Sequence, residues 1–224
     1  MRRRISSSKR FSWTPCSPSK VSSARILFAL NSAVDSLLKK EFDTYRTFSK
    51  KHPIQEKYKI DARPIPHKDL EKWRHNFTGV QYLHKATNFL IFGAIDDLWQ
   101  NSKGEYMVVD YKATSKNEKI TELNKDWQIS YKRQIEIYQW LLRKNKYKVS
   151  NTGYFVYCNG DTNKEAFDYK LEFDVTLIPY IGDDSWIEKT IFDIHKCLCN
   201  NNIPESNPDC DYCSYIDAIL EETN

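Results

Sequence analysis

The sequence lacks any run of about 18 consecutive apolar residues, which is the length a helix needs to cross a bilayer, so we expect no membrane-spanning segment. Its N-terminus starts with a basic stretch, Met1 to Ser8, but no apolar segment follows, which argues against a secretory signal. Internal repeats are also missing. These absences predict a cytoplasmic, intracellular protein with no membrane partner. In such a reducing compartment disulfides are not expected.

The net charge of +4 is unevenly distributed along the 224 residues. Residues 1–75 contain 18 Lys or Arg against 7 Asp or Glu, whereas residues 161–224 contain 4 basic against 15 acidic residues. A basic first part is suited to a polyanion such as nucleic acid. The alternative is that these charges pair internally or only solvate the surface, because the sequence does not say which residues share a face.

The length fits one domain with small extensions. Residues 1–20 are rich in Ser, Pro and Arg and read as a flexible basic arm, which leaves residues 21–224 as a single domain. Apolar residues spaced three and four apart predict helices over 22–48, 126–144 and 186–198. Apolar or alternating runs predict strands over 88–99, 105–111, 152–158 and 167–175. This order predicts an α/β fold with a central mixed β-sheet flanked by helices.

Two acidic residues and a lysine fall at the ends of two predicted strands. Asp96 lies near the end of the first strand, Asp110 near the end of the second, and Lys112 two residues further on. Strand alternation places Val108, Asp110 and Lys112 on one face, where charged groups among apolar residues need each other or a bound ion. Since Mg²⁺ is often held by one or two carboxylates with water and substrate oxygens, the pattern predicts metal-assisted phosphodiester hydrolysis. The alternative is an ordinary surface Asp–Lys pair.

A longer ordered motif surrounds this group. Gly93-x-x-Asp96, then an apolar run into Asp110-x-Lys112, then Gln134-x-x-x-Tyr138 resembles the RecB-like branch of the PD-(D/E)XK nuclease superfamily, which includes CRISPR-associated-exonuclease-like domains. The resemblance covers about residues 88–142 by motif. It implies a restriction-endonuclease-like core and a Mg²⁺- or Mn²⁺-dependent deoxyribonuclease of exonuclease or repair and recombination type. It also implies DNA as substrate, with a repair or recombination machine as a source of partner proteins.

The resemblance also implies roles for individual residues. Asp96 and Asp110 would ligate the metal with the backbone carbonyl of Tyr111, and Lys112 would orient or activate water. Gln134 and Tyr138, four apart on one helix face, would shape the site and contact the DNA strand, although Tyr138 could equally be a core residue on the apolar stripe. The family pattern selects Asp96 over its neighbour Asp97, which would become the ligand if the strand bulged.

Members of this branch often carry a further upstream acid or histidine on an early helix. The motif does not choose among three candidates in this sequence, which are Asp35, Glu41 and His84. His84 precedes the first metal-binding strand and has solvent exposure as its simpler explanation. The upstream position therefore stays open at the level of sequence.

The six cysteines offer a second metal site. Some RecB-like nucleases hold a [4Fe–4S] cluster with one N-terminal and three C-terminal cysteines, and the corresponding residues here are Cys16, Cys197, Cys199, Cys210 and Cys213. The pattern departs from the family because no cysteine follows Cys213, and Cys-x-Cys on a helix would point apart. Zinc bound by the late cysteines and unmetallated thiols are the two alternatives. Cys158 falls in a predicted strand and is expected in the core.

Three classes of function remain distinct. A metal-dependent DNA nuclease explains the ordered acids, lysine, glutamine and tyrosine. A module that grips nucleic acid without cutting it explains the charge asymmetry. A zinc- or iron–sulfur-stabilised structural protein explains the cysteines but leaves the acid–lysine group without a role.

Overall fold

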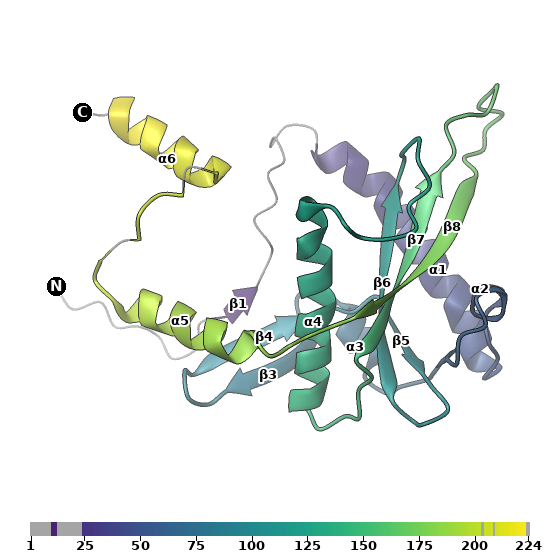
Figure 1. Cartoon of the computed structure of the whole chain (residues 1–224), viewed down its shortest axis with the longest axis horizontal. Coiled ribbons are helices and arrows are strands. Elements are labelled where there is room, and N and C mark those ends of the chain that lie inside the picture. The colour runs from purple at the N-terminus through teal and green to yellow at the C-terminus, as the bar shows by residue number, and fades with distance from the viewer. Residues whose placement is uncertain (1–9, 13–23, 203, 208, 223–224) are drawn as a thin grey trace.

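A curled five-stranded sheet forms the centre of the computed structural model, which describes residues 10–12, 24–202, 204–207 and 209–222 (Figure 1). Its strands run in the order β2 (Arg63–Pro64), β5 (Asp97–Gln100), β6 (Tyr106–Thr114), β7 (Thr152–Gly160) and β8 (Phe173–Ile181). The β6–β7 pair is parallel and the other neighbours are antiparallel. The predicted mixed sheet is therefore confirmed.

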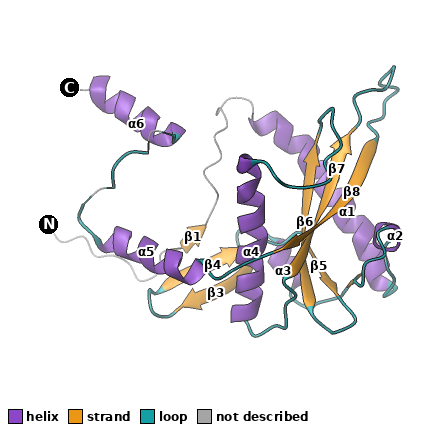
Figure 2. Cartoon of the chain, in the orientation of Figure 1, coloured by secondary structure: helices purple, strands orange, loops and turns teal. Residues whose placement is uncertain are grey.

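Helices cover both faces of this sheet (Figure 2). The helices are α1 (Ala24–Thr47), α2 (Pro53–Lys57), α3 (Leu70–Arg74), the short 3-10 helix η1 (Asp126–Gln128), α4 (Ile129–Lys144), α5 (Ile187–Cys199) and α6 (Asp211–Glu222). One core cluster joins Leu141 of α4 to Val108 and Phe155. The other joins Phe42 of α1 to Val109. Side-chain alternation along β6 thus supplies both cores, as expected for a strand covered on two sides.

A smaller three-stranded sheet lies beside the first, in the order β1 (Arg10–Ser12), β4 (Phe89–Gly93) and β3 (Val80–His84). The prediction of one strand over 88–99 was wrong, because residues 94–96 leave the ladder and β4 and β5 belong to different sheets. Within the expected arm of residues 1–20, Arg10–Ser12 pairs in parallel with Leu90–Phe92. The remainder of that arm lies outside the described residues.

The strand predicted over 167–175 begins later than expected. β8 starts at Phe173, and the preceding residues form a loop in which Asp168 and Tyr169 have φ values of 44° and 59°. Positive φ is incompatible with an extended strand, so the alternating pattern there does not form a ladder. Phe167 and Tyr169, which were expected on a half-buried strand, are instead exposed.

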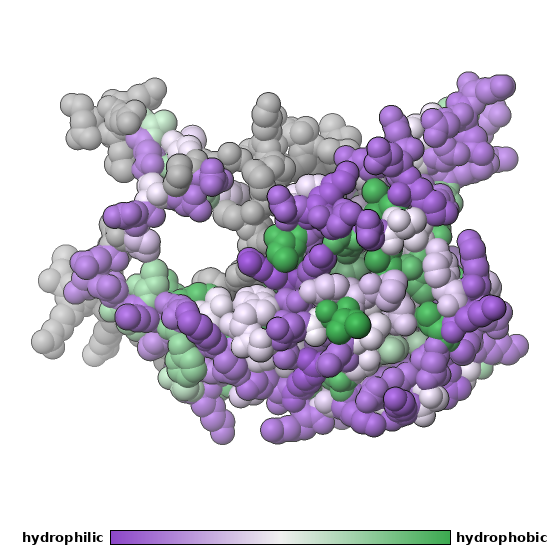
Figure 3. Space-filling view, viewed as in Figure 1, coloured by the Kyte–Doolittle hydropathy of each residue, from purple (hydrophilic) through white to green (hydrophobic). Residues whose placement is uncertain are grey.

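The helix predictions agree with the structure at the level of whole elements. Residues 126–144 form η1 and α4, and the helix expected over 186–198 is α5. Within the described ranges, none of the helices combines the length and the apolar character needed to cross a bilayer. Mainly hydrophilic side chains cover the face shown in Figure 3, broken by small apolar patches.

Candidate active site

Asp110 and Lys112 point to the α4 side of β6, the face predicted by alternation. Their neighbour Tyr111 packs into the opposite core with Val109. Asp110 is only 1% exposed, and its Oδ2 forms an ion pair with Lys112 Nζ. The other carboxylate oxygen, Oδ1, is buried and has no hydrogen-bond partner in the part of the chain that the structure describes. A buried carboxylate oxygen left in this state is costly unless a cation or donor meets it.

Asp96 lies beside Asp110 because of the antiparallel register of β5 and β6. Asp97 pairs with Val109, so the preceding residue comes level with Asp110. The Oδ2 atom of Asp96 accepts a hydrogen bond of 2.8 Å from the backbone N–H of Tyr111. Its Oδ1 atom lies 3.6 Å from Lys39 Nζ on α1. Two strands and one helix therefore converge on a pair of carboxylates.

Asp97 turns away from this pair and is completely buried. Its Oδ1 accepts hydrogen bonds from Arg46 and, at 2.8 Å, from Arg74 Nη2. Its Oδ2 accepts from Trp99 Nε1 at 2.9 Å and from the Tyr111 hydroxyl at 3.0 Å. Because each of its oxygens already has two donors, Asp97 serves the α1-side core and is not the acid that faces Asp110.

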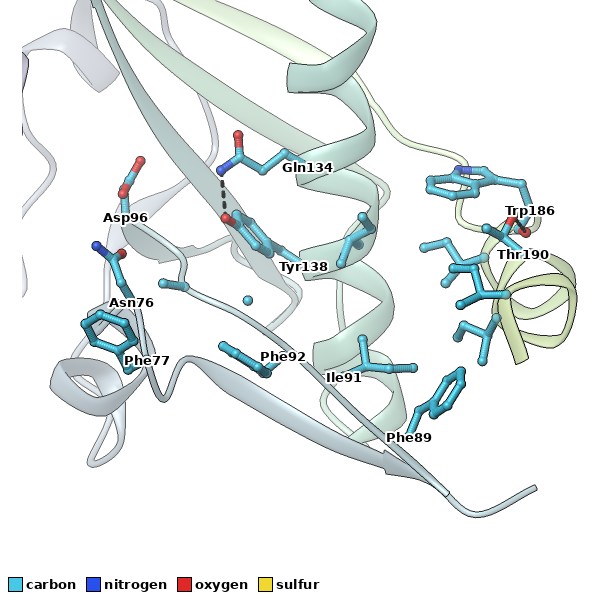
Figure 4. A pocket seen from close by; sticks show the side chains of 16 residues that line it. Asn76, Phe77, Phe89, Ile91, Phe92, Asp96, Gln134, Tyr138, Trp186 and Thr190 are labelled. Carbon is cyan, nitrogen blue, oxygen red and sulfur yellow. Dashed lines mark hydrogen bonds between the residues drawn. The ribbon is translucent and has the colours of Figure 1, made fainter. Parts of the chain in front are cut away.

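Gln134 and Tyr138 extend the polar group along α4 (Figure 4). Lys112 Nζ donates a 3.1 Å hydrogen bond to Gln134 Oε1, and Gln134 Nε2 donates one of 2.7 Å to the Tyr138 hydroxyl. Lys112 Nζ also lies 4.5 Å from the centroid of the Tyr131 ring, a cation–π contact. The structure thus joins Asp110, Lys112, Gln134 and Tyr138 in one continuous chain of polar contacts.

Gly93 allows α4 to approach this closely. A Cβ atom at that position would lie 2.5 Å from Cε1 of Tyr138, well inside contact distance. Packing therefore explains why the motif has glycine at position 93, since a larger residue would push the tyrosine and its helix outwards.

The electrostatics of the group reflect two neighbouring carboxylates, of which Asp110 is buried and Asp96 half-buried, with Lys112 and Lys39 beside them. Burial, followed by the Asp110 carboxylate, raises the pKa of Asp96 to about 7, against the opposing effect of Lys112. Burial also raises the pKa of Asp110. Burial alone would lower the pKa of Lys112, but the carboxylates of Asp110 and Asp96 outweigh it and raise that pKa. Such a site favours an additional positive charge.

The three upstream candidates occupy different places. Asp35 on α1 pairs with Lys39 at 2.8 Å, and its charge raises the pKa of Asp110, so it faces the acid pair. Glu41 instead pairs with His52 at 2.8 Å. Across the described residues, no three His, Cys, Asp or Glu side chains gather closely enough to enclose a metal ion. Asp35 therefore approaches the site without completing a three-residue cluster.

His84 is not brought to the acids. In the β3–β4 ladder it pairs with Phe89, at the opposite end from Gly93. Its Nδ1 lies 2.8 Å from Thr87 Oγ1 and its Nε2 lies 3.1 Å from Glu188 Oε2. Both ring nitrogens are thus engaged, and neither points to Asp96.

The late cysteines lie away from the acid pair in sequence and structure. Cys197 and Cys199 are exposed on α5, where Cys199 Sγ lies 3.7 Å from His195 Nε2. Cys210 directly precedes α6, and Cys213 lies in its first turn. Cys16 is outside the described residues, so the five-cysteine set stays a prediction. Cys158 is buried in β7, as expected.

Two basic residues at the site were not identified from the sequence. Lys39 falls in the helix predicted over 22–48 and was not singled out, yet it bridges Asp35 and Asp96. Arg74 was not singled out, yet its Nε donates a 3.0 Å hydrogen bond to the backbone carbonyl of Asp96. The i,i+4 spacing of Asp35 and Lys39 was the available signal for the first. No local pattern in the sequence indicates the role of Arg74.

Asp96 and the α4 residues also border a cavity of about 520 Å³ (Figure 4). Asp96, Gln134 and Tyr138 form part of its wall, and β4 and α5 provide much of the rest. A cavity of this size with polar groups at one side has the character of a ligand site.

Comparison with family models identifies the family of the chain. The family model of the PD-(D/E)XK nuclease superfamily matches residues 20–218. No individual curated protein matches the sequence. The matched range includes every residue of the acid–lysine group and all of the five-stranded sheet.

Proposed function

The chain belongs to the PD-(D/E)XK nuclease superfamily, and from this we propose that it is a DNA nuclease of the RecB-like branch that hydrolyses phosphodiester bonds with Mg²⁺ or Mn²⁺. The observation that carries the proposal is the chain of polar contacts from Asp110 through Lys112 and Gln134 to Tyr138, with Asp96 level with Asp110 on the neighbouring strand. We assign the enzyme to exonuclease-like or repair and recombination chemistry, with DNA and proteins of such a machine as partners.

The donor set fits a divalent cation. Asp96 and Asp110 offer two carboxylates on one side of the sheet, and Asp110 Oδ1 is buried without a hydrogen-bond partner among the described residues. These two acids would hold the ion, with the backbone carbonyl of Tyr111 as a third donor. When bound, the ion would polarise a phosphoryl oxygen and make a coordinated water more acidic.

Lys112 is placed to serve the reacting phosphate. Its ammonium group is held by Asp110, Gln134 and the Tyr131 ring, and the two acids keep it protonated. A fixed positive charge at this position stabilises the negative charge that develops on the phosphate in the transition state. Because Gln134 accepts from Lys112 and donates to Tyr138, it holds both side chains in register.

Cleavage assays test the proposal directly. Linear and circular DNA, single- and double-stranded, are incubated with the protein and Mg²⁺ or Mn²⁺, with EDTA as the control. We expect metal-dependent cleavage that the Lys112→Ala variant loses by about a thousandfold, as for other groups that stabilise transition-state charge. Lys119→Ala, at an exposed ion pair with Asp174, is the matched control and should cleave normally. Undiminished cleavage by Lys112→Ala would exclude the role given to this lysine.

A non-cleaving module that binds nucleic acid is the second candidate. The basic balance of residues 1–75 supports it, and so does the lack, among the described side chains, of a third ligand close to the acid pair. Binding of DNA in the absence of cleavage with every divalent ion tested would favour it. The buried carboxylate of Asp110 beside Lys112 favours cleavage, because a module that only binds DNA gains nothing from a desolvated acid next to a second one.

A further inference from the structure

The 520 Å³ cavity differs in chemistry from the acid pair that it adjoins. It lies between β4, α4 and α5, with Asp96, Asn76 and Phe77 at one end and Trp186 and Thr190 at the other (Figure 4). Most of its remaining wall consists of Ile, Phe and other apolar side chains. The cavity is therefore a mainly apolar space that opens beside a carboxylate assigned above to the metal.

The described part of the cavity wall has no positive charge to balance that of a phosphate. Among the described residues that line the cavity, none is Lys or Arg, and the acidic one is Asp96. A backbone phosphate there would meet apolar carbon and a carboxylate, both unfavourable to an anion. The wall therefore favours an occupant that is largely uncharged, with apolar faces and polar groups at its edge.

Phe77 marks the end of the cavity nearest to Asp96. Its ring is 80% exposed although it belongs to the cavity wall, so it has little packing role in the free protein. Asn76 brings a side-chain amide to the same end, which can donate to and accept from the edge of a heterocycle. An exposed phenyl ring beside an amide is a combination suited to a nucleobase.

We propose that this end of the cavity binds the unpaired base of a nucleotide next to the phosphodiester that is cut. The inference rests on the proposed function and deepens it, because it names residues of this chain that contact one base of the substrate. In a duplex the bases are stacked and paired, so a base enters such a cavity only from a single strand, a frayed end or after extrusion.

Contiguity with the reacting group supports this occupant. The cavity wall includes Asp96, one of the two acids. It also includes Gln134 and Tyr138, which are linked to Lys112 by hydrogen bonds. A phosphodiester held at Asp96 and Asp110 carries its flanking nucleosides within one nucleotide of the cavity mouth. The base stacks on Phe77 and the adjoining apolar wall, and its sugar–phosphate stays at the polar side.

The test uses single-stranded oligonucleotides that carry one abasic site, moved one position at a time past the cut phosphate. For the unmodified protein with Mn²⁺, we expect the abasic site at one flanking position to lower kcat/KM by about 5- to 150-fold, the range for loss of one stacked base. Phe77→Ala should lower kcat/KM for the intact strand and have little further effect on that abasic strand. Phe48→Ala, another exposed phenylalanine but outside the cavity wall, is the matched control.

Binding provides a readout that does not depend on catalysis. Fluorescence anisotropy of the same labelled strands in EDTA should show the same loss of affinity for the abasic position and for Phe77→Ala. Cleavage that is equal for all abasic positions, or a Phe77→Ala effect equal on intact and abasic strands, would overturn the base site and leave the nuclease intact. If no strand is cut with any metal, the proposed function fails. The base site is then judged by binding alone, and equal affinity for all abasic positions would overturn it as well.

Discussion

Arg74 on α3 holds the backbone of Asp96, the acid that comes level with Asp110. Its Nε donates a 3.0 Å hydrogen bond to the Asp96 carbonyl, while its Nη2 donates to Asp97 Oδ1 at 2.8 Å. The same guanidinium reaches Asp43 on α1 through Nη1 at 2.8 Å. The buried side chain of Arg74 on α3 thus holds both Asp96 and its neighbour Asp97, and it connects them to α1.

The Arg74→Lys variant should therefore lower activity more than it changes binding of DNA. Lysine keeps the charge but cannot reach the carbonyl and both carboxylates at once, so the Asp96 backbone gains freedom. We expect kcat to fall about 10- to 100-fold with a smaller change in KM, because displacements near 1 Å at a reacting group have effects of this size. Steady-state cleavage kinetics measure kcat and KM, and circular dichroism checks that the variant is folded.

Arg143→Lys is the control for this prediction. Arg143 on α4 makes a comparable set of contacts with Asp184 at 2.5 Å and Asn151 at 2.7 Å but does not touch the acid pair. The Arg143→Lys variant should keep the kcat of the unmodified protein. Equal losses in the two variants would show that a general effect on stability, and not the position of Asp96, explains the Arg74 result.

The acid–lysine group was predictable from the sequence because its logic is local. Alternation over a short strand places Asp110 and Lys112 together, and i,i+4 spacing places Gln134 and Tyr138 together. The structure puts all four in one set of contacts. Their chemical roles remain proposals that the assays above address.

The choice between Asp96 and Asp97 needed information that is not local. Adjacent acids have the same chemistry, and what separates them is a pair of arginines, Arg46 and Arg74, that come from α1 and α3 to occupy Asp97. The single strand expected over 88–99 was wrong because it too depended on information that is not local. Its apolar pattern continues through the point where the chain passes from one sheet to the other, and pattern alone does not mark that crossing.

Divalent ions should stabilise the fold through Asp96 and Asp110. A ligand present at 100 times its Kd contributes about 2.7 kcal/mol, which for a domain of this size raises Tm by about 5–10 °C. We expect this shift with Mn²⁺ for the unmodified protein and its loss in Asp110→Asn. Thermal unfolding with increasing Mn²⁺ measures it, and Asp174→Asn, at an exposed acid on β8, should keep the shift. An unchanged shift in Asp110→Asn would place the metal elsewhere.

His67 should make the fold sensitive to mild acid. Its ring stacks on Trp73 at 4.1 Å between centroids, and its Nδ1 accepts a 3.1 Å hydrogen bond from the backbone N–H of Asp69. Burial lowers the pKa of His67, the Asp69 carboxylate opposes this, and Lys68 adds to it. Because the folded pKa lies below the unfolded one, the unfolded chain takes up the proton first, and stability falls as pH drops below about 6.5.

The His67→Phe variant checks this prediction, since phenylalanine keeps a ring against Trp73 but cannot be protonated. Its Tm should fall less than that of the unmodified protein between pH 7 and pH 5, by an amount bounded by one proton, or about 1.4 kcal/mol per pH unit. His195→Phe, at a histidine on α5 that faces Phe89, is the control and should follow the unmodified protein. Parallel curves for all three proteins would contradict the assignment.

Gly93→Ala should disturb the site through packing alone. The added methyl group would lie 2.5 Å from the Tyr138 ring, so the ring and α4 must move, at a cost of about 1–3 kcal/mol for an overpacked position. Tyr138 holds Gln134, and Gln134 holds Lys112, so the displacement reaches the lysine. We expect a lower Tm together with a fall in kcat, measured by thermal unfolding and cleavage kinetics. Gly160→Ala is the control, because a methyl group there would meet Leu171 at an ordinary 3.4 Å. A Gly93→Ala protein with a lowered Tm but an unchanged kcat would show that Tyr138 is only a core residue, the alternative that its place on the apolar stripe allows.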